Sequence, residues 1–298
     1  MLLSHESKKM LRGVRGWTQT ANAMLSQTDK AKKFRALHER EGAFVIPNPW
    51  DAGSARLLAG LGFEALATTS SGFANSLGRL DGQVSRDEVI EHCRSVSAAT
   101  ELPVSADLEN CFADDPAGAA TTILLAARSG AVGGSIEDYT GDPLNPIYDG
   151  QLAVERVYAA VEAARSLDFH FTLTARAENL LHGKLDLDDT IRRLQAFEVA
   201  GADVLYAPGL TTLEEVRLVT SALSKPVNVL APLVKGVTIE ELADAGARRL
   251  STGGALARAA ITALLKAGGE MKERGSFAWT SDLASYADVK KLLSANIT

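Results

Sequence analysis

Cysteine and long hydrophobic runs are scarce in this sequence. Only Cys93 and Cys111 occur among its 298 residues, and their spacing fits neither a CxxC metal site nor a disulfide framework. Reduced thiols are therefore expected. No apolar run approaches the length of about 20 residues that spans a bilayer, and the first residues lack the long apolar stretch of a secretory signal. These absences predict a cytoplasmic protein with no membrane contact.

An excess of positive charge is also missing. Lys and Arg together number 31 against 37 for Asp and Glu, which gives a net charge of -6 and a pI near 5.5. Because affinity for nucleic acids comes from basic patches, we expect no nucleic-acid partner and a small molecule as the ligand. A hydrophobic fraction of 46% and a charged fraction of 23% are typical of a globular protein with a sizeable core.

One basic segment departs from this composition. Residues 7–17 contain four Lys or Arg residues and no acid, which fits a targeting leader, a flexible arm or an upstream start codon. The amphipathic pattern of a packed helix begins near residue 29. We therefore predict an N-terminal arm or leader at residues 1–25 and a single catalytic domain at residues 26–298.

Beyond residue 42, short aliphatic runs alternate with longer helical patterns, which is typical of βα units and a parallel sheet. The predicted strands lie at residues 43–46, 65–68, 103–106, 133–136, 171–174, 204–206, 227–230 and 249–251. Ala-Gly-Ala triplets at 200–202 and 245–247 predict helices that end on a C-cap glycine. Eight strands in a chain of this length predict an α/β protein, a closed (β/α)8 TIM barrel.

Acidic residues follow two of these strands. Asp107 and Glu109 come after the third strand, and Glu137 and Asp138 after the fourth. Carboxylates that lie close together must be neutralised by protons, by basic side chains or by a divalent cation. Oxygen ligands with no clustered Cys or His favour magnesium or manganese over zinc. The alternative is that each acid only caps the helix that follows it.

Chemistry in such a barrel occurs where strands end and loops begin. The other polar residues at these ends are Asn48, Asp51, Thr69, Ser70, Ser71, Arg176, Glu178, Asn228 and Thr252. Arg176 can bind a substrate carboxylate through two hydrogen bonds, and an ion pair with Glu178 is a compatible alternative. The hydroxyl and N–H groups of residues 69–72 suit an anionic carboxylate, although a plain turn has the same composition.

Two further features carry weaker signals. Thr252, Gly253 and Gly254 could bind a phosphate after the eighth strand, but a tight turn is the interpretation we favour. Among the histidines, His92 and His170 occupy positions typical of structural roles. His182 follows the fifth strand and could approach the site.

Several sequence blocks together resemble one enzyme superfamily. They lie at residues 48–56 (Asn-Pro-Trp-Asp-Ala-Gly-Ser-Ala-Arg), 68–72 (Thr-Thr-Ser-Ser-Gly), 77–82 (Leu-Gly-Arg-Leu-Asp-Gly), 105–109, 135–138, 175–176 and 253–258. Each block alone is weak, and the combination is specific. From about residue 33 to residue 293, the chain resembles the isocitrate lyase and phosphoenolpyruvate mutase superfamily.

The resemblance implies a barrel whose last helix packs on a neighbouring subunit, usually in a homotetramer. It also implies Mg²⁺, with Mn²⁺ as an alternative, at the strand ends and a 2-oxo acid as the small-molecule partner. We assign the site residues by role: Asp107, Glu109 and Glu137 to the metal; Thr69, Ser70, Ser71, Arg176 and Asn228 to the substrate; Arg176, Glu137 and Asp81 to catalysis.

The segment after the fourth strand departs from the family pattern. Lyases of the family that cleave isocitrate or methylisocitrate carry a Lys-x-Cys-Gly motif there, and residues 139–148 contain neither Lys nor Cys. Phosphonate-handling members place Lys and Asn there, and only Asn145 matches. Tyr139, Asp142 and Tyr148 are candidates for acid or base chemistry on this loop. A second departure is the absence of glycine from residues 110–113, where many relatives have a glycine-bearing turn.

These observations predict a magnesium-dependent lyase that splits a carbon–carbon bond in a small 2-hydroxy or 2-oxo di- or tricarboxylate. The negative charge of the resulting enolate would be stabilised by the cation and Arg176. Carbon–phosphorus chemistry on phosphonopyruvate or phosphoenolpyruvate and decarboxylation of oxaloacetate are alternatives. A protein that binds a 2-oxo acid without turnover is another, because the loop lacks the Lys and Cys.

Overall fold

The structure, a computed structural model, describes residues 25–294. Its sheet consists of eight parallel strands: β1 Phe44–Ile46, β2 Leu66–Ala67, β3 Val104–Ala106, β4 Gly133–Glu137, β5 Thr172–Arg176, β6 Val204–Tyr206, β7 Val227–Leu230 and β8 Arg249–Ser251. They pair in the order β1-β8-β7-β6-β5-β4-β3-β2. The Ala67 N–H donates to the Pro47 carbonyl at 3.2 Å, which joins the two ends of the sheet. The predicted (β/α)8 barrel is confirmed.

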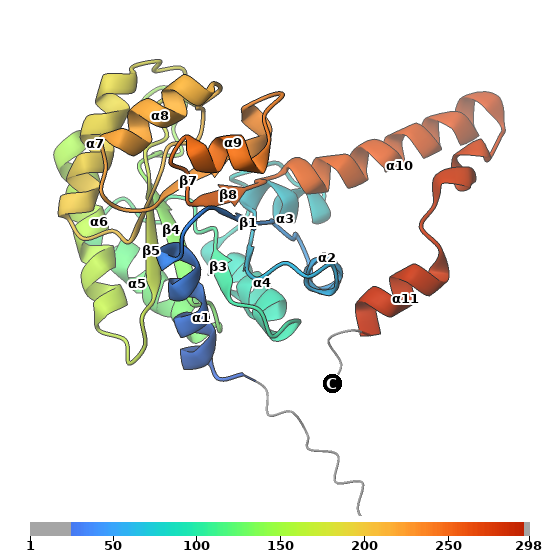
Figure 1. The fold of residues 1–298 in the computed structure, drawn as a ribbon, viewed down its shortest axis with the longest axis horizontal. Helices are drawn as coiled ribbons and strands as arrows, with labels where there is room; N and C mark the ends of the chain where they lie inside the picture. The colour runs from blue at the N-terminus through green and yellow to red at the C-terminus, as the bar shows by residue number, and fades with distance from the viewer. Residues whose placement is uncertain (1–24, 295–298) are drawn as a thin grey trace, which may run out of the picture.

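Helices alternate with the strands and cover the outside of the barrel (Figure 1). They are α1 Gln27–Glu39, α2 Ala52–Gly60, α3 Ser70–Ser76, α4 Arg86–Ala98, α5 Pro116–Arg128, α6 Gly150–Arg165, α7 Leu187–Val199, α8 Leu213–Ser221, α9 Ile239–Asp244, α10 Ala255–Arg274 and α11 Tyr286–Ser294, with short 3₁₀ helices η1 Ala231–Leu233 and η2 Ala278–Asp282. No helix in residues 25–294 is long and apolar enough to cross a membrane.

Local sequence signals explain where several helices begin and end. The Asp51 carboxylate accepts the Ser54 N–H at 2.6 Å and so caps α2, which is the usual role of Asp at an N-cap. Gly201 and Gly246 follow α7 and α9 with φ angles of 102° and 93°. Because side chains disfavour this left-handed region, glycine ends both helices as the Ala-Gly-Ala triplets predicted.

Close packing inside the barrel accounts for the two glycines of β4. A Cβ atom on Gly134 would lie 3.0 Å from Leu108 Cδ1 and 3.1 Å from Phe171 Cζ. One on Gly133 would lie 2.8 Å from the Thr172 carbonyl oxygen. The absence of side chains here lets β4 lie close to its neighbours and places Glu137 at the end of the strand.

The C-terminal helices leave the barrel. In Figure 1, α10 extends away from the sheet and α11 returns towards α2. Arg56 on α2 donates to the Leu293 carbonyl at 3.0 Å, so α11 packs against α2 of its own chain. Leu264 and Leu265 on α10 are 69% and 68% exposed. Packing of the last helix on a neighbouring subunit stays a prediction. The predicted N-terminal arm lies outside the described residues, apart from Leu25.

Candidate active site

A polar cavity of about 160 Å³ lies at the ends of the strands where the βα loops begin. Its lining includes Asn48, Thr69, Ser70, Ser71, Asp81, Asp107, Ser135, Arg176, Tyr206, Asn228, Arg249 and Ser251. This is the end of a (β/α)8 barrel at which chemistry occurs. Since one water molecule occupies about 30 Å³ of liquid, the cavity suits a small ligand.

Arg176 at the end of β5 binds three carboxylates. Its Nη1 lies 2.9 Å from Asp107 Oδ1, and its Nη2 lies 3.1 Å from Glu137 Oε2. Its Nε donates to Glu178 Oε1 at 2.8 Å. Although burial acts in the opposite direction, these three acids hold the pKa of Arg176 well above its ordinary value. Arg176 thus supplies positive charge to the acids that lie at the strand ends.

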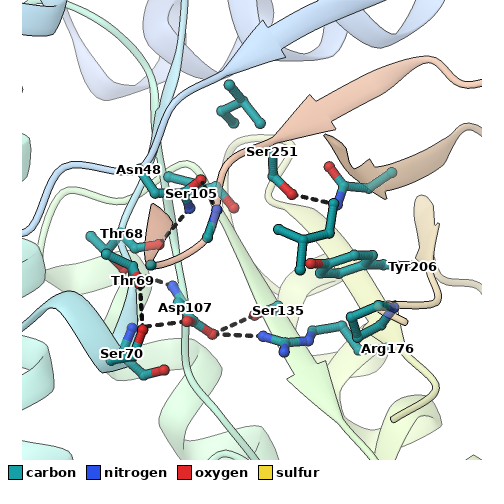
Figure 2. Close-up of a pocket in the computed structure, with 18 of the residues that line it drawn as sticks. Asn48, Thr68, Thr69, Ser70, Ser105, Asp107, Ser135, Arg176, Tyr206 and Ser251 are labelled. Carbon is teal, nitrogen blue, oxygen red and sulfur yellow. Dashed lines mark hydrogen bonds and ion pairs between the residues drawn. The ribbon is translucent and has the colours of Figure 1, made fainter. Parts of the chain in front are cut away.

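Asp107, after β3, contacts groups from several neighbouring strands in the cavity (Figure 2). Its Oδ2 accepts the backbone N–H of Ser70 at 2.9 Å, and its Oδ1 faces Ser135 Oγ at 3.4 Å as well as Arg176. The Asp107 N–H donates to Thr68 Oγ1 at 2.8 Å, which fixes the backbone beneath the carboxylate. Strands β2, β3, β4 and β5 therefore all contribute to the position of this one side chain.

Glu109 and Glu137 are carboxyl groups in a crowded, poorly solvated region. Burial, together with the nearby charges of Asp107 and Asp81, raises the pKa of Glu109 to about 8. Burial also raises the pKa of Glu137 well above its ordinary value, despite the ion pair with Arg176. A single guanidinium does not neutralise all these acids, and the balance is made up by protons or by a cation.

Asp81 and Asp107 are the acids that line the cavity, whereas Glu109 and Glu137 are not among its lining residues. Burial and then the charge of Asp107 raise the pKa of Asp81. Asp138, by contrast, pairs with Arg193 at 3.1 Å and accepts the Glu178 N–H at 2.7 Å. It is not among the residues that line the cavity, and its carboxylate stabilises the loops around the site.

The acidic groups fit a hard divalent cation. No three His, Cys, Asp or Glu side chains in residues 25–294 converge as a ready-made metal site. Mg²⁺ does not need one, because it usually keeps several waters and binds one or two carboxylates directly. Burial, and then repulsion from neighbouring acids, raises the pKa of Asp81 and Glu109, and nearby positive charge opposes this.

The predicted substrate residues have different surroundings. Ser70 and Ser71 line the cavity, and Thr69 Oγ1 lies 3.3 Å from Ser71 Oγ. Thr69 also caps α3. Asn228 lines the cavity too, but its amide is engaged on both sides, with Ser251 Oγ at 2.9 Å and Arg249 Nε at 2.8 Å. The hydroxyl groups are therefore freer than Asn228 to meet a ligand.

Asn48 holds the turn that contains the two glycines after β8. Its Oδ1 accepts the N–H groups of Thr252 and Gly253, each at 2.9 Å, and Gly253 has a φ of 52°. Its Nδ2 donates to the Thr68 carbonyl at 2.9 Å. The segment forms a tight turn in which the N–H groups of Thr252 and Gly253 are already bound, which supports the turn interpretation over phosphate binding.

The loop between β4 and α6 keeps its candidate acid–base groups out of the cavity. Tyr139 stacks on His182 with ring centroids 3.8 Å apart, and the Tyr148 hydroxyl donates to Asp114. None of Tyr139, Asp142 and Tyr148 is among the lining residues. His182 Nε2 lies 3.8 Å from Glu178 Oε2, so this imidazole contacts the site only through Glu178.

His92 and His170, the other histidines considered from the sequence, lie in packed or peripheral positions. His92 stacks on Phe73 with ring centroids 3.9 Å apart and lies 3.0 Å from the Trp50 carbonyl. His170 lies near Asp203, at 3.7 Å, before the start of β5 and away from the cavity. Both contacts agree with the structural roles predicted for these residues.

Three residues near the site were not predicted from the sequence. Tyr206 lines the cavity with its ring 5.1 Å from the Arg176 guanidinium carbon. Arg249 lines it as well, fully within β8, and donates to Thr174 Oγ1 at 3.0 Å. Arg156 lies on α6 and donates hydrogen bonds to backbone carbonyls at the end of β4 and in the loop after β3. The sequence around the two arginines gave no signal, because Arg156 follows Glu155 in an ordinary amphipathic helix and Arg249 follows Arg248.

Comparisons with known proteins agree with this fold. Residues 34–272 match the family described as phosphoenolpyruvate phosphomutase. A solved structure from Burkholderia cenocepacia J2315, provisionally described as a lyase/mutase, shares 56% identity with a TM-score of 0.87 and covers 89% of this chain and 95% of its own. The 2-methylisocitrate lyase of Escherichia coli K12 is 30% identical over 212 residues, which are 68% of this chain and 70% of that protein. Oxaloacetate acetylhydrolase, solved with its product oxalate, shares 25% identity and a TM-score of 0.79, covering 89% of this chain and 94% of that one.

Proposed function

We propose that this chain, which belongs to the phosphoenolpyruvate phosphomutase family of the isocitrate lyase/phosphoenolpyruvate mutase superfamily, is a divalent-metal-dependent carbon–carbon lyase. Membership makes it an enzyme of the lyase and mutase type, so a protein that binds a 2-oxo acid without turnover is no longer a leading alternative. The proposed substrate is a small 2-hydroxy or 2-oxo acid with two or three carboxylates. The proposed product is a 2-oxo acid released through its enolate.

The observation that carries the proposal is the position of Asp107. Its carboxylate meets the Arg176 guanidinium, the Ser70 N–H and Ser135 in one small cavity. Cleavage of a bond next to a carbonyl leaves negative charge on the oxygen, and a positive group fixed beside that oxygen lowers the barrier. Arg176, held by Glu178 and Glu137, provides such a charge without needing to reorient during the reaction.

Magnesium, with manganese as an alternative, is the proposed cofactor. Asp107 would hold it, with Glu109, Glu137 and Asp81 in support, and it would supply Lewis-acid stabilisation of the carbonyl oxygen. The hydroxyls of Thr69, Ser70 and Ser71 would orient the substrate carboxylate. Tyr206 and Arg249 on the deep side of the cavity limit how large that substrate can be.

Carbon–phosphorus chemistry is the second candidate, because the matching family is described as phosphoenolpyruvate phosphomutase. Oxaloacetate decarboxylation is a third, since one relative is named oxaloacetate decarboxylase. The products separate them. Only the phosphonate reaction yields inorganic phosphate or rearranged phosphoenolpyruvate. A cytoplasmic location and a homotetramer are also proposals.

Proton and phosphorus NMR with Mg²⁺ tests the function. The panel contains methylisocitrate, isocitrate, dimethylmalate, oxaloacetate and phosphonopyruvate. The variant is Asp107→Ala, and the matched control is Asp188→Ala, an exposed aspartate on α7. We expect one compound to be cleaved by the wild type and by the control, and not by Asp107→Ala. Turnover that persists in Asp107→Ala would rule out the proposed mechanism.

A further inference from the structure

Arg156 on α6 is a buried cation behind the acidic residues of the site. Its side chain is 1% exposed, and among residues 25–294 it forms no ion pair with a carboxylate. Instead it donates to three backbone carbonyls: Nη1 to Glu137 at 3.2 Å, Nη2 to Ala113 at 3.0 Å, and Nη2 also to Asn110. Two of these carbonyls belong to the loop after β3 and one to the end of β4. A single guanidinium therefore joins the two segments that carry Glu109 and Glu137.

The turn that Arg156 binds has a strained backbone. Glu109, Cys111 and Phe112 have φ angles of 49°, 60° and 56°, a region that residues other than glycine rarely adopt. The segment contains no glycine to relieve the strain. Such a conformation persists only where the surrounding structure holds it. The bonds from Arg156 to the carbonyls of Asn110 and Ala113 flank Cys111 and Phe112, and the first also adjoins Glu109, so they provide part of that support.

The same guanidinium is linked to the loop that follows β4. Its central carbon lies 4.1 Å from the ring centre of Tyr148, an arrangement typical of a cation–π contact. The Tyr148 hydroxyl donates to Asp114, and the Tyr148 N–H donates to the Asp138 carbonyl at 2.9 Å. Arg156 thus lies between the acidic turn and the loop, with its planar donors directed at fixed carbonyls.

From this geometry we infer that Arg156 is a positioning residue, which holds the carboxylates of Glu109 and Glu137 in register for the divalent cation. The inference rests on the proposed function in one respect, that the acids of the cavity bind a metal. Arg156 itself touches neither substrate nor metal in this assignment. Its guanidinium acts on the backbone of the two acids, as partners outside the ligand shell do in metal sites.

Direct measurement of Mn²⁺ binding tests this assignment. Free Mn²⁺ is followed by electron paramagnetic resonance in the wild type, in Arg156→Met and in Arg165→Met. Arg165 is the matched control because it lies on the same helix but pairs with Asp203 at 2.7 Å, away from the acidic loops. We expect Arg156→Met to weaken Mn²⁺ binding roughly tenfold or more, the range seen when such outer partners are removed. Arg165→Met should leave it within about twofold.

A double variant separates positioning from general loss of stability. In a Glu109→Gln background, Arg156→Met should weaken Mn²⁺ binding by a smaller factor than it does alone, because the two residues act through the same ligand. Equal factors in both backgrounds would overturn the assignment, as would unchanged binding in Arg156→Met. If Arg156→Met fails to fold, Arg156→Lys keeps a cation in the core but cannot reach all three carbonyls, and unchanged Mn²⁺ affinity in that folded variant would equally overturn it.

These outcomes are distinct from failure of the proposed function. A wild-type protein that binds Mn²⁺ with the expected dependence on Arg156, yet cleaves none of the panel compounds, would overturn the proposed function and support the role of Arg156. A wild-type protein that binds no Mn²⁺ would overturn both.

Discussion

The backbone N–H of Glu137 donates to the carbonyl of Glu109 at 3.1 Å. The two acids, which are 28 positions apart in the sequence, therefore lie on segments that a backbone hydrogen bond joins. Because the bond joins the end of β4 to the turn after β3, movement of one acid displaces the other. The acidic side of the site behaves as one unit, and the predictions that concern it follow from that coupling.

Glu109→Gln should stabilise the metal-free protein at pH 8. The pKa of Glu109 is raised from an ordinary value of 4.5 to about 8, so the folded state binds a proton that the unfolded state releases between these two pH values. Stability is therefore lost as the pH rises through this window. Allowing for solvent screening, we expect a gain of about 1 kcal/mol in the variant. Urea unfolding with EDTA at pH 8 measures it, and a variant less stable than the wild type would contradict the prediction.

Arg176→Lys should reduce turnover far more than it reduces substrate binding. Lysine is a point charge and cannot contact Asp107, Glu137 and Glu178 together as the guanidinium fork does. Loss of a preorganised charge at the reacting oxygen typically costs about 10²–10³ in kcat. Steady-state kinetics on whichever panel compound is cleaved will show this, with Arg192→Lys on the exposed side of α7 as the control. A kcat within about twofold of the wild type would contradict a role for Arg176 in stabilising the transition state.

His38 should make the fold sensitive to acid. Burial, and then the charge of Arg249, lowers the pKa of His38 to about 3, whereas the unfolded chain titrates near 6.5. The unfolded state thus binds a proton that the folded state excludes between these values, and stability is lost as the pH falls below 6.5. At pH 5 the loss is about 2 kcal/mol. Chemical unfolding at pH 7 and pH 5 should show a smaller difference in His38→Gln than in the wild type, and an equal difference would contradict the assignment.

Leu264 and Leu265 should belong to a subunit interface. Adjacent leucines with about two thirds of their surface exposed on a helix that extends from the barrel form an apolar patch of the kind that mediates association. We expect the wild type to be a tetramer by light scattering, and Leu264→Glu with Leu265→Glu to give smaller species. Leu185→Glu, at an equally exposed leucine in the loop before α7, serves as the control. A monomeric wild type would contradict the prediction.

The sequence predicted site residues correctly where reactive side chains stand at the ends of predicted strands. Asp107 and Arg176 were identified because acids and a guanidinium at the ends of predicted strands must meet in a closed barrel. Asp138 shows the limit of that reasoning. It comes directly after Glu137, the last residue of β4, but side chains alternate across a strand. Asp138 therefore faces Arg193 and the Glu178 backbone, whereas Glu137 pairs with Arg176.

Arg156 and Arg249 show a different limit. Each lies in a helix or strand of ordinary pattern, and only the fold reveals that neither has a carboxylate partner among the described residues. Arg156 is 46 positions from Asn110 and 43 from Ala113, a relationship that no local pattern encodes. Tyr139 and Tyr148 were acid–base candidates because they lie on the loop after the fourth strand. In the structure, His182 holds Tyr139 and Asp114 holds Tyr148 outside the cavity.

By itself, the sequence determined the eight strands, the helix ends and the set of acids and hydroxyls at the strand ends, because hydrophobic periodicity, caps and glycines act over a few residues. The tertiary structure decided which of those groups share one cavity, that Arg176 binds three acids at once, and that Arg156 supports a glycine-free turn. These depend on contacts between segments far apart in the chain, and burial there sets the charge states through desolvation.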